Sequence, residues 1–156
     1  MKEEIIIKKL ISNKETIATM ESCTAGYLVA NLTNVDGSSE VIKVSLVTYS
    51  NEYKIKFGVK AQTIEKYSVY SNETSREMAK SVSEFANSTY GIGITGQINR
   101  VDPNNPYGKD NEIFVTIYNS KNKEYNDFII ICPNKKRKLC KEYIIDKVYD
   151  KLIEIL

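Results

Sequence analysis

The chain has 156 residues, of which 42% are apolar and 27% charged, and a formal net charge of +2 at pH 7. These values are those of an ordinary globular protein, and the length predicts one domain, residues 1–156, with a substantial core. So small a net charge gives no global electrostatic argument for binding nucleic acid or a membrane surface.

Apolar residues recur with helical spacing in some segments and alternate with polar residues in others, which predicts both helices and strands. In the first half of the chain the expected elements are a helix ending near 12–13, a strand at 16–20, a helix directly after Ser22, a turn at 34–39, a strand at 41–50 and a helical turn at 51–57 stopped by Gly58. A helix capped by Ser71 follows, and then a strand at 90–95 ended by Gly96 and a loop at 97–112. The last expected elements are strands at 113–118 and 125–131 and a helix from about Lys135. Strands that alternate with helices and end in a hairpin predict an α/β layered domain with a mixed sheet.

Because neither a signal peptide nor a membrane span is recognised, the protein is expected to be cytoplasmic. Residues 1–10 are too short and too charged for a signal peptide, and no stretch approaches the ~20 apolar residues of a membrane span.

The basic run at 135–138, followed by Lys141, has no interleaved aromatic residues. We therefore interpret it as a solvated helix face, and nucleic acid is not an expected partner.

The cysteine and histidine content limits the metal-binding and catalytic chemistry that this chain can support. The three cysteines form no Cys-x-x-Cys pair and histidine is absent, which argues against a zinc site and against a disulfide framework. The absence of histidine also excludes Ser-His-Asp and Cys-His catalysis within this chain. We expect neither a metal nor a cofactor.

The most informative segment is Glu-Ser-Cys-Thr-Ala-Gly at residues 21–26. It follows an apolar strand and precedes a helical pattern, so it is expected to deliver a hydroxyl and a thiol to the first turn of a helix. Unpaired backbone N–H groups and the helix dipole favour negative charge there. Ser22 is then either a nucleophile whose oxyanion meets these donors or an N-cap that only satisfies them.

This hexamer resembles the Glu-Ser-Cys-Thr-Gly-Gly signature of the CinA carboxy-terminal domain family, whose activity is nicotinamide mononucleotide deamidation. Further resemblances follow in the family's order over nearly the whole chain: 36–39 to its PGSS turn, 47–54 to its VAYSNEAK segment, 69–73 to its AVSEE helix start, 93–96 to its AVTG strand end and 106–108 to its PVG. The resemblance implies a three-layer α/β/α sandwich with a mixed sheet, a cofactor-free homo-oligomer, and hydrolysis of the nucleotide's carboxamide to nicotinic acid mononucleotide and ammonia.

The resemblance also implies the catalytic roles. Ser22 becomes the acyl-forming nucleophile, and Lys54 its base, since a lysine can act as a base when its surroundings favour the neutral amine. Tyr49 is the matching partner that relays a proton or orients the lysine. Asn51 either fixes the turn or touches substrate. The plain alternatives are a solvated surface lysine and an aromatic residue that only packs at a strand end.

The residues after Ser22 are implied to hold the oxyanion. Backbone N–H groups of Thr24 and Ala25 are the expected donors, within a substrate-binding segment that also includes Cys23 and Gly26. Cys23 is either a reactive thiol at a helix start or, as we expect, a small buried hydrophobe. Ala25 replaces a family glycine, which we expect to require a negative φ.

A substrate with a 5′-phosphate also needs an anion site, which we expect at Thr95 and Gly96, where glycine permits close backbone approach. The following loop departs from the family: the Gly-Pro pair of Thr-Gly-x-x-Gly-Pro-Gly-Gly is missing, and residues 109–112 are inserted before the next strand. Arg100 either restores phosphate binding through its fork or is an ordinary loop arginine. The altered loop keeps two alternatives open: a Ser-Lys amidohydrolase with another amide substrate, and a non-enzymatic ligand-binding homologue.

Overall fold

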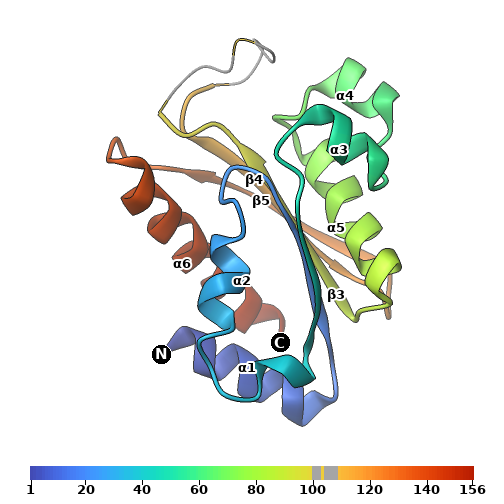
Figure 1. Ribbon diagram of the computed structural model, residues 1–156, viewed down its shortest axis with the longest axis vertical. Coiled ribbons are helices and arrows are strands. Elements are labelled where there is room, and N and C mark those ends of the chain that lie inside the picture. Colours follow the sequence, from blue (N-terminus) through green and yellow to red (C-terminus); the bar gives the residue numbers. More distant parts are fainter. Residues whose placement is uncertain (100–102, 104–108) are drawn as a thin grey trace.

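The computed structural model describes residues 1–99, 103 and 109–156. Within them one five-stranded mixed sheet lies between two layers of helices (Figure 1), so the expected three-layer α/β/α sandwich is confirmed. In chain order the elements are α1 (Lys2–Asn13), β1 (Ile17–Glu21), α2 (Tyr27–Leu32), a 3₁₀ turn (Ser38–Glu40), β2 (Ile42–Val47), α3 (Asn51–Lys56), α4 (Ala61–Tyr67), α5 (Asn72–Ala86), β3 (Tyr90–Gly96), β4 (Glu112–Asn119), β5 (Glu124–Ile131) and α6 (Arg137–Ile155).

The sheet has the strand order β2-β1-β3-β4-β5. Strand β1 pairs in parallel with both β2 and β3, whereas β4 and β5 continue the sheet as an antiparallel hairpin. All five residues of β1 are buried, because helices cover both faces of this part of the sheet and a strand covered on both sides has no solvent-facing positions.

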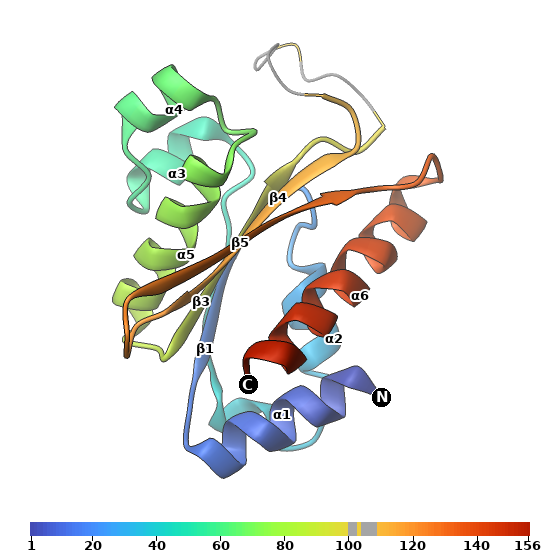
Figure 2. The same ribbon diagram turned by 180° about the vertical axis from the view of Figure 1, so that it is seen from behind.

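Helices α3, α4 and α5 lie on one face of the sheet, and α1, α2 and α6 lie on the other. Both views of the molecule show this arrangement (Figures 1 and 2). The larger core cluster joins the sheet to α1 and α6, and a smaller one joins it to α5. A side chain at Gly91 or Gly93 would collide with the backbone of α5. These two glycines let α5 pack directly against the centre of the sheet.

Most expected elements are present with boundaries close to those predicted. Ser71 caps α5 by accepting a hydrogen bond from the Thr74 N–H at 3.2 Å. Helix α4 was not predicted, because none of its residues is buried and its N-cap, Lys60, makes no side-chain cap. The helix predicted after β1 is present as α2, but it begins at Tyr27 and not directly after Ser22. The turn that intervenes is described below.

The loop predicted at 97–112 ends at residue 111, since β4 begins at Glu112. Arg100 and the segment 106–108 lie outside the described residues. Among the residues that the structure does describe, no helix is both long enough and apolar enough to cross a bilayer.

Candidate active site

The carboxyl ends of three parallel strands meet at one edge of the sheet, with β1 between β2 and β3. The chain leaves β1 through α2 on one face and leaves β2 through α3, α4 and α5 on the other (Figure 1). Connections that leave neighbouring strands on opposite faces create a crevice outside the carboxyl ends of those strands, where α/β proteins bind ligands. Ser22 is the first residue after β1, at this position.

The strand register aligns Ser22 with two threonines. Glu21, the last residue of β1, pairs with Val47 of β2 and with Ile94 of β3. The residues that come next on the three strands are therefore Thr48, Ser22 and Thr95, in that spatial order. The Ser22 N–H donates to the Ile94 carbonyl at 2.9 Å, and the Thr48 N–H donates to the Glu21 carbonyl at 3.0 Å, so the alignment continues past the strand ends.

Lys54 completes the centre of the site. Its Nζ lies 2.9 Å from Ser22 Oγ and 2.8 Å from the Thr48 carbonyl oxygen, donating to both. The lysine is 2% exposed and Ser22 is 7% exposed. Helix α3 places it there because Ser50 caps the helix, accepting from the Tyr53 N–H at 3.3 Å. Lys54 is therefore not the solvated surface charge that a lysine-rich composition favours.

The turn after β1 corrects two sequence-based expectations. Gly26, not Ser22, is the N-cap of α2, so the reading of Ser22 as a helix cap is excluded. Ala25 has a φ of +52°, followed by +87° at Gly26, so the expectation of a negative φ at Ala25 is wrong. Two successive left-handed residues turn the chain tightly from the sheet into α2, and a residue with a side chain is strained in that conformation.

The two backbone N–H groups in this turn that were expected to hold an oxyanion differ in whether they already donate a hydrogen bond. The Ala25 N–H already donates to the Ser22 carbonyl at 2.9 Å. Within the described residues, the Thr24 N–H has no hydrogen-bond partner. Of the two backbone groups expected to hold an oxyanion, Thr24 is the one left free by the turn.

Glu21 was not singled out from the sequence, yet it organises this turn. Its buried carboxylate accepts hydrogen bonds from Thr24 Oγ1 at 2.5 Å, from the Leu28 N–H at 3.1 Å and from the Val29 N–H at 3.3 Å. The negative group at the start of α2 is thus a glutamate of the chain itself, where helix N–H groups stabilise an anion. The signal in the sequence was an acidic residue at the end of an otherwise uncharged strand.

Cys23 points into the core between the sheet and α6 and is 5% exposed. Burial raises the pKa of its thiol to about 12, with smaller contributions from Cys132 and Glu21. A thiol that stays protonated at neutral pH is a poor nucleophile. The environment of Cys23 agrees with the small buried hydrophobe that we expected.

Tyr49 follows β2 and is 62% exposed. Its hydroxyl accepts a hydrogen bond from an Nη atom of Arg137 at 3.4 Å, and the other Nη donates to the Ile98 carbonyl oxygen at 2.6 Å. Arg137, the first residue of α6, therefore spans from the end of β2 to the end of β3. Sequence reasoning missed it because it stood within a basic run interpreted as solvated.

Thr95 and Gly96, expected to bind the phosphate, have structural roles. Thr95 is buried and donates to the Val69 carbonyl at 3.0 Å. A side chain at Gly96 would collide with Ile113 of β4, so close packing alone accounts for this glycine. Asn51 is the half-buried first residue of α3. Arg100 is outside the described residues, and its role stays a prediction.

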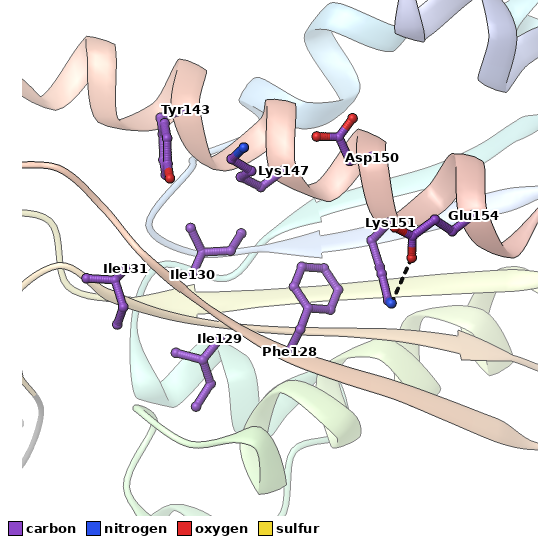
Figure 3. A pocket seen from close by; sticks show the side chains of 9 residues that line it. All are labelled: Phe128, Ile129, Ile130, Ile131, Tyr143, Lys147, Asp150, Lys151 and Glu154. Atoms are coloured by element: carbon purple, nitrogen blue, oxygen red, sulfur yellow. Dashed lines mark hydrogen bonds and ion pairs between the residues drawn. The ribbon is translucent and has the colours of Figure 1, made fainter.

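A separate surface groove lies between β5 and α6 (Figure 3). Phe128 and its three isoleucine neighbours form one side, and Tyr143 with charged residues of α6 forms the other. Among the described residues that line this groove, none belongs to the Ser22–Lys54 pair or its neighbours.

Comparison with known proteins places these features in context. The sequence model of the CinA C-terminal domain matches residues 1–154. A protein of Alkaliphilus metalliredigens (strain QYMF), provisionally named a competence-damage inducible protein, is 50% identical over 95 residues, or 60% of this chain and 23% of the relative. A protein of Thermoanaerobacter pseudethanolicus, with the same name, is 44% identical over 95 residues, again 60% of this chain and 23% of the relative. The chain thus matches about a quarter of the length of these relatives.

Two solved structures show the same fold. One is of a competence or damage-inducible protein from Enterobacter asburiae, with a TM-score of 0.91 and 21% identity, covering 99% of this chain and 95% of that one. The other is of a CinA superfamily protein from Klebsiella pneumoniae 700603, with a TM-score of 0.90 and 19% identity, covering 98% of this chain and 94% of that one. At these identities the likeness concerns the fold alone.

Proposed function

Because the chain belongs to the CinA C-terminal domain family, we propose that it is an amidohydrolase that converts nicotinamide mononucleotide to nicotinic acid mononucleotide and ammonia. The observation that carries the proposal is the 2.9 Å contact between Lys54 Nζ and Ser22 Oγ, two buried polar groups at the carboxyl ends of parallel strands. This separation is within the reach required of a nucleophile and its base.

In the proposed reaction Ser22 Oγ attacks the carbon of the carboxamide while Lys54, as the neutral amine, accepts the hydroxyl proton. The tetrahedral intermediate then collapses, and the lysine returns that proton to the departing nitrogen, so ammonia leaves an acyl-serine ester. Water attacks this ester while Lys54 accepts one of its protons, and the lysine then returns that proton to the leaving Ser22 Oγ, which regenerates the serine and releases the carboxylic acid. In this scheme the same base serves both halves, and no histidine is needed, since the chain has none.

The developing oxyanion needs fixed donors. The Thr24 N–H is the candidate, since it has no partner among the described residues and lies two residues from the nucleophile. Glu21 holds Thr24 through a 2.5 Å hydrogen bond from its hydroxyl. In this scheme Glu21 acts as a positioning residue that keeps the turn in the shape the oxyanion requires.

The phosphate of the substrate needs a cation. Arg137 reaches across the ends of β2 and β3 and has donors in a planar fork that suits phosphate oxygens. Tyr49, its partner, would then position the guanidinium and act on substrate from the rim of the site. Arg100 stays a second candidate for the same role.

The alternatives also have support. The loop after β3 departs from the family pattern, which favours a different amide substrate with the same Ser-Lys chemistry. A non-enzymatic binding protein is less well supported, because burying an amine costs free energy and binding alone gives no reason to keep it against a serine. Self-association and a cytoplasmic location stay predictions.

The test is ammonia release from nicotinamide mononucleotide by the purified protein. Ser22→Ala should abolish turnover, and Ser39→Ala, which changes an exposed serine, should leave it intact. Turnover that survives in folded Ser22→Ala protein would refute the mechanism. Folded wild-type protein without turnover would refute this substrate and direct the search to other amides.

A further inference from the structure

In the part of the chain that the structure describes, two buried polar side chains that follow the strands next to Ser22 lack hydrogen-bond partners. Gln97 is 3% exposed, and neither its amide oxygen nor its amide nitrogen is paired within the described residues. Among the residues that the structure describes, the hydroxyl of Thr48, which is 1% exposed, is also unpaired. Buried polar atoms in folded proteins are nearly always paired, because an unpaired one costs the free energy of its lost hydration.

Side-chain alternation places Gln97 on the same face of the sheet as the nucleophile. Met20 of β1 belongs to the core cluster against α5, so Ser22, two residues later, continues that face. Thr95 of β3 donates to the carbonyl of Val69, which follows α4, whereas Ile98, two residues past the end of β3, packs into the opposite cluster. Gln97 therefore shares the face of Thr95 and Ser22.

The spacing brings the Gln97 side chain within reach of the site. Thr95 is level with Ser22 on the neighbouring strand, and Gln97 lies two residues further on. Ideal strand geometry puts the Cα atoms of Gln97 and Ser22 about 8 Å apart. Rotation about the three side-chain bonds of the glutamine can then carry its amide to a group bound against the serine. Thr48 lies on the other side of Ser22, so the two unpaired groups flank the nucleophile.

We propose that Gln97 determines specificity for amides: its carbonyl oxygen accepts a hydrogen bond from the NH₂ group of a carboxamide positioned for attack by Ser22. This inference rests on the proposed amidohydrolase function. An ester or a carboxylate has no N–H to offer this oxygen, so the site favours the amide substrate and releases the acid product. A glutamine amide provides such an acceptor without a charge that burial would penalise.

The test compares an amide with an ester in Gln97→Met protein, which keeps the length of the side chain and removes its polar atoms. The kcat/KM for nicotinamide mononucleotide should fall about tenfold or more, as for a lost hydrogen bond to substrate. Hydrolysis of 4-nitrophenyl acetate should not change, and the melting temperature should stay or rise, because an unpaired amide is gone. Gln62→Met, at the chain's other glutamine, which is exposed, is the matched control.

A binding measurement separates this inference from the reaction. Calorimetry on Ser22→Ala protein should show tighter binding of nicotinamide mononucleotide than of nicotinic acid mononucleotide, and Ser22→Ala/Gln97→Met should lose that preference. That result supports the inference even if wild-type protein proves inactive. An unchanged amide-to-ester ratio in Gln97→Met overturns it and leaves the proposed function intact. Absence of nucleotide binding by Ser22→Ala overturns it as well.

Discussion

Lys54 Nζ lies 2.9 Å from Ser22 Oγ although 32 residues separate them in the chain. The contact exists because β1 and β2 pair in parallel, so that their carboxyl ends coincide, and because α3 starts directly after β2. Both side chains are almost fully buried. Burying an amine costs free energy, which its hydrogen bonds to the Ser22 hydroxyl and the Thr48 carbonyl offset in part, and the reaction proposed above gives the contact a use.

Replacing Lys54 by methionine should lower the kcat for nicotinamide mononucleotide by about 10²–10⁴-fold, the usual contribution of a general base. The free energy of unfolding should change by no more than about 1–3 kcal/mol, because the Thr48 carbonyl and the Ser22 hydroxyl lose a donor while the cost of burying an amine disappears. Lys56→Met, which changes an exposed lysine on the same helix, should leave kcat unchanged. Comparable losses in both variants would contradict the assigned role.

Thr24→Val should lower kcat more than it changes KM. The valine keeps the shape of the side chain but breaks the hydrogen bond to Glu21, so the turn that presents the Thr24 N–H loosens. The free energy of unfolding should fall by about 1–3 kcal/mol, because a buried carboxylate oxygen loses a donor. Thr33→Val, at an exposed position after α2, is the control for steady-state kinetics and urea unfolding.

Ala25→Gly should stabilise the protein by about 0.5–1 kcal/mol. The left-handed conformation costs alanine about 1–2 kcal/mol, and part of the gain is offset by the greater freedom of glycine in the unfolded chain. Ala30→Gly, at an exposed position inside α2 where φ is negative, should instead destabilise by about 0.5–1 kcal/mol. Opposite signs in urea unfolding would verify the strain at Ala25, and equal signs would refute it.

Arg137→Met should raise the KM for nicotinamide mononucleotide about tenfold or more, the usual effect of losing a charge-assisted hydrogen bond. It should change the KM for nicotinamide riboside, which has no phosphate, far less. Lys138→Met, the neighbouring exposed cation, should affect neither substrate. Equal effects of Arg137→Met on both substrates would remove this arginine from the phosphate site.

Stability should decrease as the pH rises above about 9. Burial raises the pKa of Cys23 and of Cys132 from 9.0 to about 12. In this window the unfolded chain releases the thiol protons while the folded protein keeps them, so the folded state binds more protons and its stability falls with rising pH. Each thiol contributes a slope of up to about 1.4 kcal/mol per pH unit. Urea unfolding at pH 8 and 10.5 measures the slope, and Cys23→Ala should reduce it.

How far the site could be predicted differs from residue to residue. Ser22 and Lys54 stand in recognisable motifs, and the structure brings them together. Glu21 stands in the first motif, but its hydrogen bonds to the turn and to α2 are not evident from that motif. Arg137 could not be found in this way, because its role depends on groups that other segments supply. The Arg137 guanidinium meets Tyr49 and Ile98 only after α6 has packed across the sheet.

The sequence by itself determined the order and type of most elements, because the period of apolar residues and the capping residues act over a few neighbours. It also determined which residue types are present for chemistry, including the absence of histidine. Only the tertiary structure decided that Lys54 is buried against Ser22, that Ala25 is left-handed and that the Gln97 side chain is buried. These features depend on the register of parallel strands, which is set by packing between segments far apart in the chain.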